Sequence, residues 1–143
     1  MQEDREAWLR KRTVSQFTPG EMQPERDHGF RGTNTQPHEF EGRKYRETLG
    51  GWFSFDMAVD PRQPNTLYCT YWGNRFYNHS FDIEVDGVKV GFENIHNWGA
   101  RYVERSYPIP AELTSGREKV TVTLRAIRGD AVAGPLFDCR IMR

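Results

Sequence analysis

Apolar and polar residues alternate with a period of two from about residue 39 almost to the C-terminus, and this alternation constrains the fold most strongly. Successive side chains of a β-strand point to opposite faces, so the pattern is typical of strands with one buried face. The residues expected to face inward are Phe53, Phe55, Met57 and Val59; Leu67, Cys69 and Tyr71; Phe81, Ile83 and Val85; Val88, Val90 and Phe92; Val120, Val122 and Leu124; and Phe137, Cys139 and Ile141.

Turn residues separate these runs. Asp86-Gly87 favours a tight hairpin turn, and Pro61, Pro64, Pro108 and Pro110 fall between runs, because proline cannot donate to a strand ladder. About eight short strands are expected, with no amphipathic helix after residue 12. The sequence therefore predicts an all-β fold, an antiparallel β-sandwich of the jelly-roll or galactose-binding-like type. A closed barrel is the alternative.

The N-terminal part of the chain lacks this alternation. Residues 1–12 surround Trp8 and Leu9 with charged side chains, which favours a linker or the end of a connecting helix. Residues 13–38 are rich in glycine and proline and are expected to form a loop-rich lead-in to the sandwich. Its expected apolar anchors are Val14, Phe17, Met22 and Phe30. Residues 13–143 are therefore assigned to a single domain, which suits a chain of 143 residues.

Composition excludes several classes of protein. The chain has 20 Lys and Arg against 20 Asp and Glu, so it lacks the positive excess that nucleic-acid binding requires. No apolar stretch approaches the roughly 20 residues that span a bilayer. Two cysteines and four histidines without ligand spacing predict neither a metal site nor a cofactor. Aromatic residues make up 13% of the chain, and this surplus is the first indication of function.

The acidic residues show no catalytic pattern. Asp82, Glu84 and Asp86 share an outward strand face, which is typical of a solvated surface. Glycoside hydrolysis needs two carboxyl groups placed about 5 to 9.5 Å apart across a sugar, and no such pair is evident. The run from Asp82 to Glu93 resembles a calcium loop, but Glu84 stands where Asp or Asn is expected and strands replace the flanking helices. The sequence predicts a hairpin there and no catalytic residue in this chain.

The two cysteines, Cys69 and Cys139, lie in phase with core positions of their strands. Buried free thiols are favoured over a disulfide.

The tryptophans are the best candidates for a functional site. Trp52, Trp72 and Trp98 each adjoin a glycine, and Trp52 and Trp72 are out of phase with the core. An indole face is a flat apolar platform for a sugar ring, and nearby amides and guanidinium groups can bond its hydroxyls. The candidate carbohydrate-binding residues are Trp72, Trp98, Asn74, Arg75, Asn97 and Arg101. Trp52 and Trp72 are also candidates for an interdomain interface. This interpretation is slightly favoured over a sugar site.

Several separated motifs, in order, resemble a known family. They are PGEMQPERDHGFRGTN (19–34), GGWFSFDMAVDPRQPNTLYCTYWG (50–73), FDIEVDGVKV (81–90), YPIPAELTSGREKVTVTLRA (107–126) and AGPLFDCRI (133–141). Together they are similar to the C-terminal β-sandwich domain of bacterial β-L-arabinofuranosidase-like proteins of glycoside hydrolase family 127.

The resemblance implies that the chain is an accessory domain that follows the catalytic domain of the same polypeptide. In such enzymes the cysteine nucleophile, with carboxylate and zinc support, belongs to a separate helical-barrel domain, and neither Cys69 nor Cys139 matches it. A periplasmic or extracellular bacterial location is implied as well.

Three functions remain open. The first is a non-catalytic domain that packs against, or stabilises, a glycoside hydrolase. The second is a carbohydrate-binding module for arabinose-containing plant oligosaccharides. The third, a hydrolase in its own right, is a remote alternative.

Overall fold

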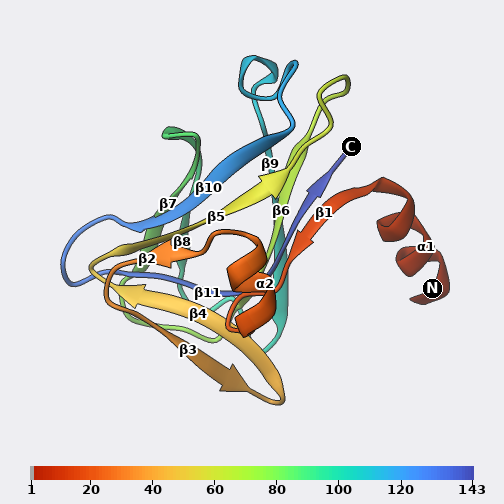
Figure 1. Cartoon of the computed structure of the whole chain (residues 1–143). Coiled ribbons are helices and arrows are strands. Elements are labelled where there is room, and N and C mark those ends of the chain that lie inside the picture. The colour runs from red at the N-terminus through yellow and green to blue at the C-terminus, as the bar shows by residue number, and fades with distance from the viewer. Residues whose placement is uncertain (1) are drawn as a thin grey trace.

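A computed structural model of the chain describes residues 2–143 and confirms the antiparallel β-sandwich (Figure 1). In chain order the elements are α1 (Gln2–Arg12), β1 (Thr13–Phe17), α2 (Met22–Asp27), β2 (Arg31–Gly32), β3 (Thr35–Phe40), β4 (Arg43–Leu49), β5 (Trp52–Ala58), β6 (Thr66–Trp72), β7 (His79–Val85), β8 (Val88–Ile95), β9 (Tyr102–Pro108), the 3-10 helix η1 (Ala111–Leu113), β10 (Lys119–Ala126) and β11 (Val132–Met142).

The strands form two separate sheets across the described residues, so the sandwich and not the barrel is the architecture. Sheet A has the order β3-β4-β11-β6-β9, and sheet B has the order β2-β5-β10-β7-β8. Strand β11 joins sheet A along its whole length. It pairs with β6 on one side, while on the other its first half pairs with β4 and its second half with β1. All of these pairings are antiparallel.

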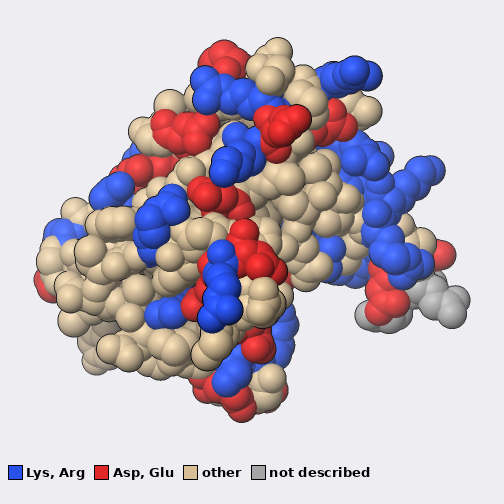
Figure 2. Space-filling model, viewed as in Figure 1, with Lys and Arg blue, Asp and Glu red and all other residues tan. Residues whose placement is uncertain are grey.

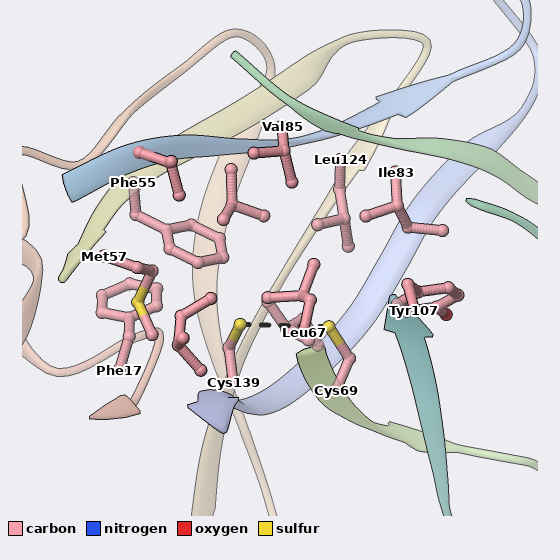
Figure 3. Packing of buried hydrophobic residues seen from close by; sticks show 14 of the residues in the cluster. Phe17, Phe55, Met57, Leu67, Cys69, Ile83, Val85, Tyr107, Leu124 and Cys139 are labelled. Carbon is pink, nitrogen blue, oxygen red and sulfur yellow. Dashed lines mark hydrogen bonds between the residues drawn. The ribbon is translucent and has the colours of Figure 1, made fainter. Parts of the chain in front are cut away.

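The core lies between the two sheets and contains most of the predicted inward residues. Figure 3 shows Cys69 and Cys139 of sheet A facing Ile83, Val85 and Leu124 of sheet B. Burial of such side chains stabilises the fold by roughly 1.5 to 3 kcal/mol each before the loss of chain entropy is counted. The period-two pattern thus identifies the interior of this protein.

Two predicted inward residues of β8 were assigned wrongly. Val88 is exposed beside the hairpin turn, although it pairs with the buried Val85. Phe92 is exposed because the ladder between β7 and β8 shifts register between Ile83 and Glu84. Beyond the shift, Gly91 faces Tyr107 of sheet A, and Phe92 pairs with the outward Asp82. A β-bulge of this kind reverses the phase of every residue that follows it.

The N-terminal lead-in contains more regular structure than the sequence predicts. Strand β1 completes one edge of β11, and its Phe17 is fully buried and stacks on Phe55 at 4.3 Å between ring centroids. Phe30 and Val14 pack against the core as expected. Met22 was wrongly predicted as an anchor, because it lies exposed at the start of α2.

Candidate functional site

A cluster of aromatic side chains covers the outer face of sheet A. This outer-face cluster consists of Phe40, Tyr45, Trp72, Tyr102 and Phe137. The ring centroids of Phe40 and Trp72 are 4.9 Å apart, those of Trp72 and Tyr102 are 5.0 Å apart, and those of Tyr102 and Phe137 are 5.1 Å apart. Tyr45 completes the chain at 4.7 Å from Phe137. One aromatic side chain from each of the strands β3, β4, β6, β9 and β11 therefore contributes to one continuous aromatic surface.

Phe137 joins this cluster because of a second β-bulge. The ladder between β11 and β6 shifts register between Leu136 and Asp138, so Phe137 stands between two paired residues. Leu136 remains in the core, whereas Phe137 contacts Tyr45 and Tyr102 on the outer face. The prediction that Phe137 faces the core with Cys139 and Ile141 is therefore wrong. Phe137 is nevertheless only 1% exposed.

Beside the cluster, the outer face of sheet A is hollowed. One hollow of about 370 Å³ is lined by Gln16, Lys44 and Phe137, and one of about 330 Å³ by Thr70, Tyr102 and Glu104. Both are also lined by Arg43, Asp138 and Arg140, so they adjoin, and together they are called the outer-face groove.

Helix α1 forms one wall of the outer-face groove. Its Leu9 is buried beside Thr70, and its Arg5 forms an ion pair with Glu104. The rest of α1 projects from the body of the sandwich (Figures 1 and 2). Positive and negative side chains alternate over the face drawn in Figure 2, so no field of a single sign dominates there.

One buried polar group in the outer-face groove has no hydrogen-bond partner in the described part of the chain. The hydroxyl of Tyr102 is buried and has no hydrogen-bond partner among the described residues. The guanidinium of Arg43, an exposed residue, lies 4.4 Å above the Tyr102 ring and 5.6 Å from the Phe137 ring, and its charge attracts the Asp138 carboxylate. Native proteins satisfy the great majority of buried polar groups, so such orphans mark places where a ligand or water is expected.

Asp138 supplies a partly buried carboxylate to the groove, and this carboxylate has partners. Burial raises the pKa of its carboxyl, and Gln16, Arg140 and Arg43 only partly oppose this effect. Gln16 Nε2 donates to one carboxylate oxygen at 2.9 Å, and Arg140 Nε lies 3.4 Å from the other. A carboxylate held this way can accept hydrogen bonds from hydroxyl groups of a ligand.

The sequence-predicted sugar residues gather elsewhere, on two neighbouring loops. This loop platform consists of residues 73–78 and 96–101. Backbone N–H groups of Gly73, Asn97 and Trp98 donate to the carbonyls of Arg101, Arg75 and Gly73 at 2.9, 2.7 and 2.9 Å. The structure thus brings Asn74, Arg75, Asn97, Trp98 and Arg101 into one region at the end of the sandwich. Trp72 lies at the end of β6, where the first loop begins, and belongs to the outer-face cluster.

None of the three predicted tryptophans presents an open ring face. Trp72 is 9% exposed and is covered by Phe40 and Tyr102, but it lies outside the two layers and not between them. Trp98 packs against the core, and the Arg105 guanidinium lies 4.2 Å above its ring. Trp52 lies on the outer face of sheet B, partly buried beside Arg125.

The freely exposed rings are ones that the sequence analysis missed. Phe76 is 50% exposed and Tyr77 is 85% exposed, both in the first loop of the loop platform. The position of these two aromatics in a loop was a usable sequence signal, because loops lie on the surface and often carry binding residues. Trp8 of α1 is exposed as well.

The acidic residues of the predicted hairpin are paired with cations. On the outer face of sheet B, Asp82 lies 3.1 Å from Lys89, and Glu84 lies 3.1 Å from Arg125. Asp86 lies 3.5 Å from Arg117. Across the described part of the chain, no group of three or more His, Cys, Asp or Glu side chains is placed to hold a metal ion. No described helix is both long enough and apolar enough to cross a membrane.

Solved structures with the same fold are carbohydrate-binding modules and a glycosidase. A family 35 carbohydrate-binding module from Clostridium thermocellum matches with a TM-score of 0.61 and 16% identity, over 78% of this chain and 90% of that one. A family 6 module of Cellvibrio mixtus lichenase 5A, in complex with cellotriose, matches with a TM-score of 0.58 and 15% identity, over 92% and 98% of the chains.

An exo-β-1,3-galactanase from Phanerochaete chrysosporium has a TM-score of 0.63 at 9% identity, and the match covers 88% of this chain but 28% of that one. At these identities the matches establish the fold alone. A sequence comparison with curated proteins finds no match. Residues 8–142 match a family described as being of unknown function, DUF6805. Since the match spans nearly the whole chain, the protein belongs to the DUF6805 family.

Proposed function

We propose that this chain is a carbohydrate-binding domain and that the outer-face groove holds the sugar. The observation that carries the proposal is a buried Tyr102 hydroxyl without a partner among the described residues, next to aromatic rings and the exposed Arg43 guanidinium, in a hollow on one face of the sandwich. Binding pockets are typically apolar clefts of about 300 Å³ or more with a few convergent polar groups. The shared fold with carbohydrate-binding modules supports the same conclusion.

The groove offers a sugar two kinds of contact. The rings of Tyr102 and Phe137 form an apolar surface on which the C–H face of a sugar can lie once Arg43 swings aside. Asp138 accepts hydrogen bonds from sugar hydroxyls, while Arg43 and the Tyr102 hydroxyl donate to them. Because Arg43 is exposed, its rearrangement costs the stacking contact, about 0.5 to 1 kcal/mol, together with part of its attraction to Asp138.

The groove is built for binding and not for hydrolysis. Its two carboxylates are already engaged, Asp138 with Gln16 and Arg140, and Glu104 with Arg5. A glycosidase instead needs one free acid and one free base or nucleophile on either side of the scissile bond.

The resemblance to β-L-arabinofuranosidase-like proteins supplies the finer proposal. The sugar is then an arabinose-containing plant oligosaccharide, and the domain holds it near the catalytic domain of a glycoside hydrolase encoded upstream in the same polypeptide.

Calorimetric titration tests the proposal. The purified chain is titrated with arabino-oligosaccharides, and with galacto- and gluco-oligosaccharides as alternatives. We expect binding in the millimolar range or tighter to at least one series. Asp138→Asn keeps the shape of the groove but removes its charge, so it should weaken binding. Tyr77→Ala, on the loop platform, is the matched control and should bind normally. Loss of binding in Tyr77→Ala but not in Asp138→Asn would move the site to the loop platform.

Packing against a neighbouring domain is a second candidate function. Its support is the loop platform, where Phe76 and Tyr77 are exposed although backbone hydrogen bonds fix the loop that carries them. Exposed aromatic residues on a fixed surface are typical of protein interfaces. Hydrogen exchange of residues 73–78 should slow in the full polypeptide relative to the isolated chain. Equal exchange in both would remove this candidate.

A further inference from the structure

Cys69 and Cys139 lie directly opposite one another in the core. They are paired residues of the neighbouring antiparallel strands β6 and β11, and their sulfur atoms are 3.9 Å apart (Figure 3). Both are free thiols and both are fully buried, as the sequence predicts. Paired residues of antiparallel strands have Cα atoms about 4.5 to 5.5 Å apart, which falls within the range that a disulfide requires. The strands therefore need no displacement to be cross-linked.

The pair lies immediately beneath the outer-face groove. The adjacent rung of the same ladder pairs Thr70 with Asp138, and both of these residues line the groove. Their side chains face outward because successive residues of a strand alternate between its faces. A bond between the two sulfurs would thus join the two central strands that carry the floor of the groove.

We propose that Cys69 and Cys139 form a cross-strand disulfide when the chain folds in the presence of a low-molecular-weight disulfide. One cysteine thiolate attacks a sulfur of the oxidant, which forms a mixed disulfide and releases one small thiol. The thiolate of the other cysteine then attacks the protein sulfur of that mixed disulfide and releases the second small thiol. Two protein thiols are oxidised, the oxidant is reduced to two thiols, and the two protons pass to the released thiolates.

The folded protein resists this reaction. Burial raises the pKa of the Cys139 thiol, so the thiolate that must attack is scarce once the core has closed. The redox state is therefore set while the core is still open, and the compartment in which the chain folds determines it. This inference does not depend on the proposed sugar binding.

The test compares two ways of refolding the whole chain. Protein that has been unfolded and reduced is refolded either with oxidised glutathione or with dithiothreitol, then denatured, alkylated and weighed by mass spectrometry. We expect the first sample to take up no alkyl group and to have lost two hydrogen atoms. Because the cysteines are 70 positions apart, closing this loop should raise the Tm by about 10 °C, and dithiothreitol should abolish the rise.

The matched control is Cys69→Ala, which retains a single thiol. It should take up one alkyl group, and its Tm should not respond to dithiothreitol. Two results would overturn the proposal: two alkylated cysteines in wild-type protein refolded with oxidised glutathione, or glutathione retained on either cysteine. A disulfide-bonded product that melts below the reduced protein would contradict the expected stabilisation by loop closure. Mass and Tm are independent of ligand, so this failure is distinguishable from failure of the proposed function.

Discussion

The two outer faces of the sandwich are built from the same alternating pattern but differ in how their polar groups are satisfied. On sheet B, Asp82, Glu84 and Asp86 each lie within 3.5 Å of a cationic side chain. One buried oxygen of Asp82 accepts no hydrogen bond from the described residues, but the Lys89 ammonium group, 3.1 Å away, compensates its charge. On sheet A, the buried Tyr102 hydroxyl has neither a hydrogen-bond nor an ion-pair partner within residues 2–143, and the exposed Arg43 guanidinium lies above the Tyr102 ring. The difference teaches that a strand pattern locates the outer faces, whereas a buried polar group with neither a hydrogen bond nor a charged partner identifies the face that is the candidate for a ligand.

The largest effect is expected for two outward phenylalanines, one on each face. Phe137→Ala should lower the free energy of unfolding by about 3 to 4 kcal/mol, since the ring is almost fully buried beneath the aromatic cluster. Phe92→Ala, where the ring is 47% exposed on sheet B, should cost less than about 1 kcal/mol. Urea denaturation measures both. Equal losses of stability in the two variants would contradict this, because they would mean that Phe137 is packed no more tightly than the exposed Phe92.

The next effect concerns ligand affinity. Asp138→Asn should weaken sugar binding about 10-fold or more, because a hydrogen bond to a charged acceptor contributes about 1.5 to 3 kcal/mol. Glu84→Gln makes the same chemical change on sheet B, where Glu84 is paired with Arg125, and should leave affinity unchanged. Calorimetric titration of both variants gives the comparison, and equal affinities for the two would contradict it.

The pH dependence of folding stability should distinguish the outer face of sheet A as well. The pKa of Asp138 is raised above its ordinary value of 3.8, chiefly by burial. The folded state therefore binds the proton of the Asp138 carboxyl more tightly than the unfolded state does. The stability that this proton contributes is present below pH 3.8 and is lost as pH rises through the raised pKa. Wild type should thus lose stability relative to Asp138→Asn between acidic and neutral pH. Urea midpoints at several pH values measure this, and a pH-independent difference would contradict it.

The smallest effect is expected on the charged ladder of sheet B. Arg125→Gln removes the partner of Glu84 at the surface, and exposed ion pairs contribute about 0 to 1 kcal/mol. Its urea midpoint should lie close to that of wild type, and the remaining difference should shrink in high salt. A large loss of stability would contradict this, because it would mean that the ion pair between Glu84 and Arg125 stabilises the fold more than solvent-exposed pairs do.

Much of the fold follows from local pattern, and most of the groove does not. The alternation places Phe55, Leu124 and Cys139 correctly, because burial of one strand face repeats every second residue. It misplaces Phe92 and Phe137, because a bulge adds one residue and the sequence carries no mark of it. A β-bulge is therefore a place where the alternation gives the wrong face.

The candidate site eluded the sequence for a further reason. The groove residues Gln16, Arg43, Tyr102 and Asp138 lie on β1, β4, β9 and β11. They come close only because β1, β4 and β6 pair with β11 and β9 pairs with β6. Tryptophans were predicted as site residues from their chemistry, but the exposure of a ring depends on which side chains cover it. Phe40 and Tyr102 cover Trp72, and Arg105 covers Trp98.

One substitution tests the central claim most directly. Tyr102→Phe removes only the buried hydroxyl that has no partner, so binding and stability should change in opposite directions. A buried hydroxyl without a hydrogen bond destabilises the protein, so its removal should leave the urea midpoint equal or higher. If the hydroxyl serves a sugar, affinity in calorimetric titration should fall about 10-fold. Unchanged affinity for every oligosaccharide that wild type binds, or no binding by wild type, would contradict the account.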